Sequence, residues 1–240
     1  MELGQSPYAP LRSSLRGVLA FLCLAICLPR PASGSPEDVR AQVRIFARNQ
    51  YVHGVPYLEA RALGAGGIAP LHAILKDERE KRYWTTAIEA IAFIDADESY
   101  PIIRHFIWNR FTGSIDDTTL HAVISAVSVL GTISETSAPT IIDDLIAATR
   151  PQYWQSLPWS CSVRDVARNR WFAQVATTSL QWTGSSRADS LFDALLESPD
   201  RVVTIGTLPE LKERCARVRT LGLEGYERAQ REQRRREGGR

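Results

Sequence analysis

The residues that could do chemistry are scattered along this sequence and form no catalytic motif. There is no HExxH zinc site, no GxSxG nucleophile elbow, no phosphate-binding GxxxxGK[ST] loop and no GxGxxG dinucleotide fingerprint. The four histidines, His53, His72, His105 and His121, have no companions at the spacing of metal ligands. Residues 95–98 (DADE) lack the central glycine and distal glutamate of a calcium loop. The sequence therefore predicts a non-enzymatic protein with no metal and no cofactor.

A second group of candidate residues lies in the segment 150–161 (RPQYWQSLPWSC), which is rich in aromatic residues and prolines. Trp154 and Trp159 combine a large apolar surface with an N–H donor, which makes tryptophan a frequent anchor at protein interfaces. A loop of this length must also bury side chains to stay ordered. Partner recognition and local packing are both open for these two candidate binding residues.

The C-terminal region is basic, with ten basic and five acidic residues between positions 212 and 240. One interpretation is a solvated helix that ends at glycines 238–239, and the other is contact with an anionic surface or a partner. Nucleic acid is not expected, because the chain's 29 basic and 27 acidic residues nearly balance. The expected partner is a protein.

The first 34 residues have the order of a secretory signal. Arg12 and Arg16 precede an apolar stretch at 17–28, and the small residues 32–34 form a cleavage site. Twelve apolar residues are too few to span a bilayer as a helix. We predict cleavage after Gly34 and export to the periplasm or the medium, and a retained N-terminal anchor is the alternative.

Two cysteines, Cys161 and Cys215, would remain after this cleavage. An exported protein enters an oxidising compartment, where paired thiols tend to form disulfides. We therefore predict a Cys161–Cys215 disulfide, which would close a loop of about fifty residues and stabilise the fold by roughly 3–4 kcal/mol. Two separate buried thiols are the alternative.

The elements that position these residues are predicted to be helices. Of the 240 residues, 44% are hydrophobic and 23% are charged, as in a folded globular protein. Apolar periodicity and capping residues predict helices at 36–49, 55–63, 69–76, 83–94, 100–110, 117–130, 138–149, 163–182, 188–197, 209–221 and 224–236. Only the run 202–205 (VVTI) suggests a strand. The predicted fold class is all-α.

Four segments share one pattern, which is an alanine-rich helix end, a short turn and a new helix. The marker residues at these helix ends are Leu63, Ile91, Leu130 and Leu180. In the first three segments a proline opens the next helix, where its missing N–H costs nothing. Three markers are preceded, four positions earlier, by an alanine that lets neighbouring helices approach closely: Ala87, Ala126 and Ala176.

This pattern, with the strings 87–95 (AIEAIAFID) and 129–139 (VLGTISETSAP), resembles the HEAT-repeat family, especially short bacterial HEAT-like repeats. The resemblance covers roughly residues 55–200. It implies a short α-solenoid of helical hairpins with a right-handed superhelix at 35–222, followed by a basic helix or tail at 223–240. The markers are 28, 39 and 50 residues apart, which departs from the family spacing. An irregular helical bundle is the alternative.

In the HEAT family the second helix of each hairpin lines a concave surface, and solenoids bind extended partners there. Aligning these helices on their markers places the positions two, five and nine before each marker on one face. The candidate binding residues on this face are Arg82, Thr86, Glu89, His121, Ser125, Ser128, Trp171 and Thr178. A solvated helix face with no partner is the alternative.

The resemblance and the predicted signal together imply an exported protein-interaction or scaffold module of the bacterial cell envelope or secreted fraction. Two alternatives stay open. One is a membrane-tethered assembly subunit that keeps its N-terminal helix. The other is an accessory or lyase-like enzyme, because some HEAT-like repeats resemble chromophore lyases.

Overall fold

The computed structural model divides the chain into two units, Met1–Ser35 and Pro36–Arg240. It describes residues 36–49, 51, 54–197 and 207–238, all within the second unit. The predicted signal at 1–34 and the strand-like run at 202–205 lie outside the described residues. The structure is 81% helical and 2% strand, which confirms the predicted all-α class.

Ten α-helices follow one another along the described residues. They are α1 (Pro36–Arg48), α2 (Tyr57–Arg61), α3 (Ile68–Lys76), α4 (Trp84–Ile94), α5 (Ser99–Trp108), α6 (Asp117–Val129), α7 (Ser134–Ala148), α8 (Asp165–Ser179), α9 (Ser186–Glu197) and α10 (Thr207–Gly238). Short 3-10 segments lie between them: η1 (Ala65–Gly67), η2 (Glu78–Tyr83), η3 (Leu130–Thr132), η4 (Pro151–Ser156) and η5 (Leu180–Trp182). Each predicted helix overlaps one of these α-helices. The predicted helices 209–221 and 224–236 are the two parts of α10, which lie on either side of a non-helical Gly222.

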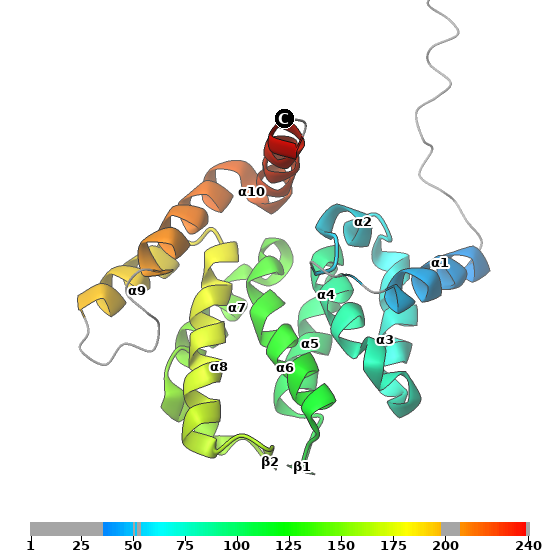
Figure 1. Cartoon of the computed structure of the whole chain (residues 1–240), viewed down its shortest axis with the longest axis horizontal. Helices are drawn as coiled ribbons and strands as arrows, with labels where there is room; N and C mark the ends of the chain where they lie inside the picture. Colours follow the sequence, from blue (N-terminus) through cyan, green and yellow to red (C-terminus); the bar gives the residue numbers. More distant parts are fainter. Residues whose placement is uncertain (1–35, 50, 52–53, 198–206, 239–240) are drawn as a thin grey trace, which may run out of the picture. The chain divides into compact units, whose positions relative to one another are not determined.

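The helices pack in two alternating sets. α2, α4, α6 and α8 contact one another in this order, and Figure 1 shows α4, α6 and α8 side by side. We call α4, α6 and α8 the central helices. α3 packs on α4, α5 on both α4 and α6, and α7 on α8. α9 contacts α7 and α10.

α4 and α6 are apolar over much of their circumference because other helices cover them on several sides, whereas α8 also buries polar residues such as Arg168 and Asn169. α4 buries most of its length: Trp84, Ala87, Ile88, Ala90, Ile91, Ala92 and Ile94. The alanines that the repeat pattern singled out, Ala87, Ala126 and Ala176, are each 0% exposed. Small side chains at these positions let the central helices approach closely, as the sequence predicts.

A glycine brings the end of α6 against the end of α8. The Gly131 N–H donates to Ser179 Oγ at 2.9 Å. A Cβ atom at Gly131 would lie 2.0 Å from the Ser179 carbonyl oxygen, closer than any side chain allows. Packing therefore explains the glycine that follows the third marker, Leu130, because only a residue without a side chain lets the two helix ends come this close.

Two very short strands, β1 (Gly113–Ser114) and β2 (Trp159–Ser160), form a parallel pair that the sequence does not predict. The Gly113 N–H donates to the Pro158 carbonyl at 3.1 Å, and the Ile115 N–H donates to the Ser160 carbonyl at 2.9 Å. The pair ties the loop before α6 to the loop before α8. Two-residue strands carry too little sequence signal for a periodicity to reveal them.

The predicted Cys161–Cys215 disulfide is wrong in this structure, because both cysteines are free. Cys161 precedes α8, and its Sγ lies 3.7 Å from the Val163 carbonyl oxygen. Cys215 is buried on α10, where its Sγ lies 3.9 Å from the carbonyl oxygen of Leu180, just beyond the end of α8. The 15 residues of α8 span about 22 Å. The two thiols thus lie near opposite ends of one helix, whereas a disulfide needs Cα atoms within about 7 Å.

Candidate functional site

A cavity of about 620 Å³ lies between α6, α8, the loop before α2 and the later part of α10. Most of its wall is apolar: Val55, Pro56, Tyr57, Phe93, Ile124, Val129, Val175, Trp182 and Leu223. Its neutral polar side chains are Ser128, Thr132, Thr178, Ser179 and Gln181, and its charged ones are Glu227, Arg231 and Arg234. Apolar walls with a few polar groups are typical of ligand pockets.

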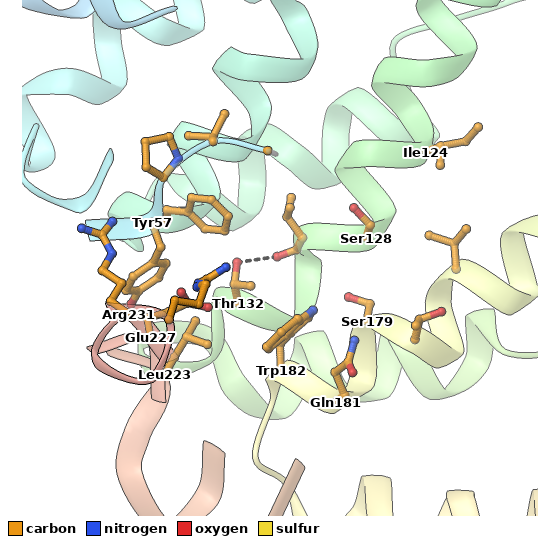
Figure 2. Close-up of a pocket in the computed structure, with 18 residues that line it drawn as sticks. Tyr57, Ile124, Ser128, Thr132, Ser179, Gln181, Trp182, Leu223, Glu227 and Arg231 are labelled. Atoms are coloured by element: carbon orange, nitrogen blue, oxygen red, sulfur yellow. Dashed lines mark hydrogen bonds between the residues drawn. The ribbon is translucent and has the colours of Figure 1, made fainter. Parts of the chain in front are cut away.

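The hydroxyl groups of the cavity come from turns at the ends of the central helices. Ser128 Oγ donates to the Ser125 carbonyl at 2.8 Å, and Thr178 Oγ1 donates to the Gln174 carbonyl at 2.7 Å. Thr132 Oγ1 donates to the Val129 carbonyl at 2.6 Å, the bond dashed in Figure 2. Because each hydroxyl gives its proton to the backbone, its oxygen retains lone pairs that can accept hydrogen bonds.

The later part of α10, residues 223–238, forms the opposite side of the cavity, and we call it the C-terminal segment (Figure 2). It begins after Gly222, where a φ of 68° and a ψ of 162° interrupt the helix. Glycine adopts such a positive φ without strain, so this residue can redirect the chain. The kink coincides with the predicted start of the basic tail at residue 223.

The C-terminal segment is held against α2 by a small apolar cluster and by exposed ion pairs. Leu223 and Tyr226 are buried in one cluster with Tyr57 of α2 and Val218 of α10. The guanidinium of Arg231 pairs with the carboxylate of Glu59. A further ion pair joins Arg61 Nε to Glu224 Oε2 at 3.6 Å. Part of the predicted tail is thus packed, and its contact with an anionic surface stays a prediction.

The electrostatics of the cavity centre on Glu227, which is half-buried in the C-terminal segment. Burial raises the pKa of its carboxyl group above the ordinary value, while the nearby charges of Arg234, Arg231 and Arg214 lower it. No hydrogen bond from any described residue reaches this carboxylate. Glu227 is therefore a partly desolvated charge that lacks a donor.

Three of the predicted face residues, Arg82, Thr86 and Glu89, line a second hollow of about 290 Å³ beside the main cavity. Gly54 and Val55 line both hollows. Glu89 is engaged inside the fold, since its Oε1 accepts from Ser125 Oγ at 2.7 Å and its Oε2 accepts from the Val55 N–H at 3.1 Å. This carboxylate therefore ties the loop before α2 to α6.

The other predicted face residues divide into three groups. Ser128 and Thr178 line the main cavity. Ser125 is buried and bonds to Glu89, so it belongs to the tie between α4 and α6. His121 and Trp171 are exposed one or two turns earlier on α6 and α8, and they line neither hollow.

The tryptophans of the aromatic loop are inside the protein. Trp154 is 0% exposed, and its indole N–H donates to the Ala148 carbonyl at 2.7 Å. Its ring stacks on Trp108 and packs against Phe172. Trp159 is 3% exposed and packs edge-on against Phe172. Of the two interpretations of this loop, local packing fits the structure, because neither indole reaches the surface where a partner would bind.

Sequence reasoning missed the half of the cavity that comes from α2 and the C-terminal segment. Leu223 and Tyr226 stand three residues apart within a strongly charged run, which is the spacing of one apolar helix face. That spacing indicates packing, but it does not identify α2 as the surface covered. Glu227 and Arg231 gain their role only from this packing.

Comparison of the chain with protein-family models, with curated proteins and with solved structures found no match. Within the described part of the chain, no group of three or more His, Cys, Asp or Glu side chains is placed to hold a metal ion. None of the described helices is long and apolar enough to cross a membrane.

Proposed function

We propose that this chain is an exported, non-enzymatic interaction module whose main cavity binds an extended segment of a partner protein. The observation that carries the proposal is the cavity, where the ends of α6 and α8 and the C-terminal segment present apolar walls, hydroxyl oxygens and charged groups to one hollow. Binding surfaces of this composition bury apolar side chains and hydrogen-bond the backbone of a bound segment.

The module proposed here is a short HEAT-like α-solenoid with a right-handed superhelix. The order of helix contacts supports it, because α4, α6 and α8 contact one another in turn while α3, α5 and α7 each pack on at least one of them. Stacked hairpins give this order when their second helices share one layer. The cavity then lies on the layer that such proteins use for binding.

The charges around the cavity support a protein partner rather than nucleic acid. The C-terminal segment carries glutamates among its arginines, and three of its arginines form ion pairs: Arg228 with Glu224, Arg231 with Glu59, and Arg236 with Glu232. Nucleic-acid binding draws its affinity from unneutralised basic side chains that contact phosphates. The arginines that are already paired with glutamates contribute little to such binding.

Site-specific photo-crosslinking tests the proposal. The full chain is produced in its organism of origin with a photoreactive amino acid at Thr178, inside the cavity, or at His105, exposed on α5. A discrete protein adduct is expected from position 178 and not from position 105. The adduct should disappear when Val175→Arg fills the cavity of a protein whose circular dichroism is unchanged. Identical adducts from both positions, or none, would contradict the proposal.

The same preparation tests export. The intact mass of the purified protein should lack the first 34 residues, as cleavage after Gly34 requires. A full-length mass confined to the membrane fraction would favour the tethered alternative instead.

A further inference from the structure

Glu227, the acidic side chain that lines the main cavity, differs from two nearby glutamates in having no hydrogen-bonded partner among the described residues. Glu224 and Glu232, on the same segment, pair with Arg228 and Arg236 respectively. Glu227 lines the cavity, is half-buried, and receives no hydrogen bond from the described residues. A carboxylate that is partly removed from water without a donor is costly to the fold. A ligand that brings a positively charged donor would relieve this cost.

The arginines beside Glu227 do not supply that donor. The guanidinium of Arg231 is bound by both carboxylate oxygens of Glu59. Arg214 Nη1 donates to Gln181 Oε1 at 2.7 Å, which directs this arginine to η5. Arg234 is exposed at the rim of the cavity, where water solvates its charge. A hydrogen-bond donor for the Glu227 carboxylate would therefore have to come from a ligand.

Several other groups of the cavity, though not its two arginines, suit the same kind of ligand. Ser128 and Thr178 give their hydroxyl protons to backbone carbonyls, so both oxygens act as acceptors toward the cavity. Three aromatic rings, from Tyr57, Phe93 and Trp182, also line the wall. Aromatic rings pack well against hydrocarbon chains, whereas the cation sites over Tyr57 and Trp182 are already taken by Arg61 and Arg214.

We propose that the cavity takes a lysine or arginine side chain from the partner's extended segment, with the cationic end at Glu227. This inference rests on the proposed function, because it names the chemistry by which the same cavity selects its partner. The hydrocarbon stem of the basic side chain lies along the apolar wall, and its donors pair with the carboxylate and the hydroxyl oxygens. Arg231 and Arg234 also line the cavity, so the preference for a cation belongs to the part of the cavity at Glu227 and the hydroxyl oxygens, where an anionic group would be repelled.

The test uses three probes with the same apolar chain and different ends: n-hexylammonium, n-hexanol and n-hexanoate. Each is titrated into the full mature protein, and the indole N–H signal of Trp182, which lines the cavity, reports binding by nuclear magnetic resonance. Hexylammonium is expected to bind at least about fivefold more tightly than hexanol, and hexanoate more weakly than either. The variant Glu227→Gln should remove the preference for hexylammonium over hexanol. The matched control Glu232→Gln, on the same segment but outside the cavity, should keep it.

Three results would overturn the inference: equal affinity for all three probes, tighter binding of hexanoate, or an unchanged preference in Glu227→Gln. Absence of binding by every probe would also overturn it. These failures are distinct from failure of the proposed function. If the probes show no preference but position 178 still forms its adduct, the cavity binds a partner through other chemistry. If the amine is preferred but no adduct forms, the cavity selects cations without serving a protein partner.

Discussion

Two aromatic clusters of the protein differ in what covers them. The first, which we call the loop cluster, consists of Trp108, Trp154, Trp159 and Phe172 and belongs to the main core. The second, the cavity cluster, consists of Tyr57, Phe93, Trp182 and Tyr226. Trp154 and Phe172 are 0% exposed, whereas Trp182 and Phe93 are only partly buried and line the cavity.

The comparison shows that aromatic composition does not separate a packing region from a binding region. The aromatic loop is the richer of the two in tryptophan and proline, yet its rings are covered by α5, α8 and the loop itself. The cavity cluster combines rings from four elements that meet only in the folded chain. It is a candidate site because two of its rings, Phe93 and Trp182, are only partly buried and because the nearby Glu227 carboxylate has no hydrogen-bond donor among the described residues.

Removal of a ring from the loop cluster should have the largest effect on stability. Trp154→Ala deletes a fully buried indole and leaves the Ala148 carbonyl without its donor. We expect a loss of about 3–5 kcal/mol in the free energy of unfolding, measured by urea denaturation. The control Trp171→Ala removes an indole that is 37% exposed, and it should cost less than about 1 kcal/mol. Weaker partner capture by Trp154→Ala at unchanged stability would instead make the loop a recognition element.

The corresponding substitution in the cavity cluster should have a smaller and more local effect. Tyr226→Ala removes a ring that is 6% exposed and packs on Trp182 and against Tyr57. We expect a loss of about 1–3 kcal/mol, seen as faster hydrogen exchange in residues 223–238 before the rest of the protein opens. The control Leu221→Ala changes a side chain that is 48% exposed, and exchange in the segment should stay the same. Uniform destabilisation of every helix by Tyr226→Ala would show that the two clusters form one cooperative unit.

The ion pair that fastens the C-terminal segment to α2 should contribute less still. A double-mutant cycle with Glu59→Ala and Arg231→Ala should give a coupling energy below about 1 kcal/mol, because both side chains are partly exposed. This coupling should fall further in high salt, which screens exposed charges. The pair Glu232–Arg236, one turn apart within α10, serves as a reference for a purely local contact. A coupling energy well above this range at high salt would contradict the description of the segment as loosely fastened.

The smallest expected effect is a pH-dependent one at Glu227. Burial raises the folded-state pKa of its carboxyl group, and the charges of Arg234, Arg231 and Arg214 oppose this shift only in part. The folded protein therefore binds this proton more tightly than the unfolded chain does. The contribution of Glu227 to stability is then greatest below its ordinary pKa and falls as the pH rises through the raised value. Glu227→Gln, which imitates the neutral form, should therefore be slightly more stable than the parent at pH 7 and equally stable near pH 4. Unfolding curves at the two pH values measure this difference. A variant that is less stable at pH 7 would show that the carboxylate has a stabilising partner.

The helices of this protein could be predicted because their causes are local. Apolar periodicity places α4 and α6 to within one or two residues, and the buried positions of Ala87, Ala126 and Ala176 follow from their alignment with the markers. The all-α class follows from the same periodicity.

The site was predicted in part, because half of it depends on contacts between distant segments. The alignment of the central helices identified Ser128 and Thr178, which line the cavity. It could not reveal that α10 kinks at Gly222 and packs Tyr226 in one cluster with Tyr57. The fate of Trp154 was open for the same reason, since burial depends on which elements cover a ring. The wrong disulfide has this cause too, because pairing two cysteines requires knowing that a whole helix separates them.

The contact between α2 and the C-terminal segment has a consequence for the order of folding. Glu59 and Arg231 are 172 residues apart in the sequence. Bringing them together costs conformational entropy, which must be lost before their contact can stabilise the fold. The contacts among α3 to α8 join nearer neighbours and should form earlier. Substitutions between α2 and the segment should accordingly speed unfolding and leave the folding rate almost unchanged. The cavity would then be completed in the last step of folding, after the helices that supply its floor are in place.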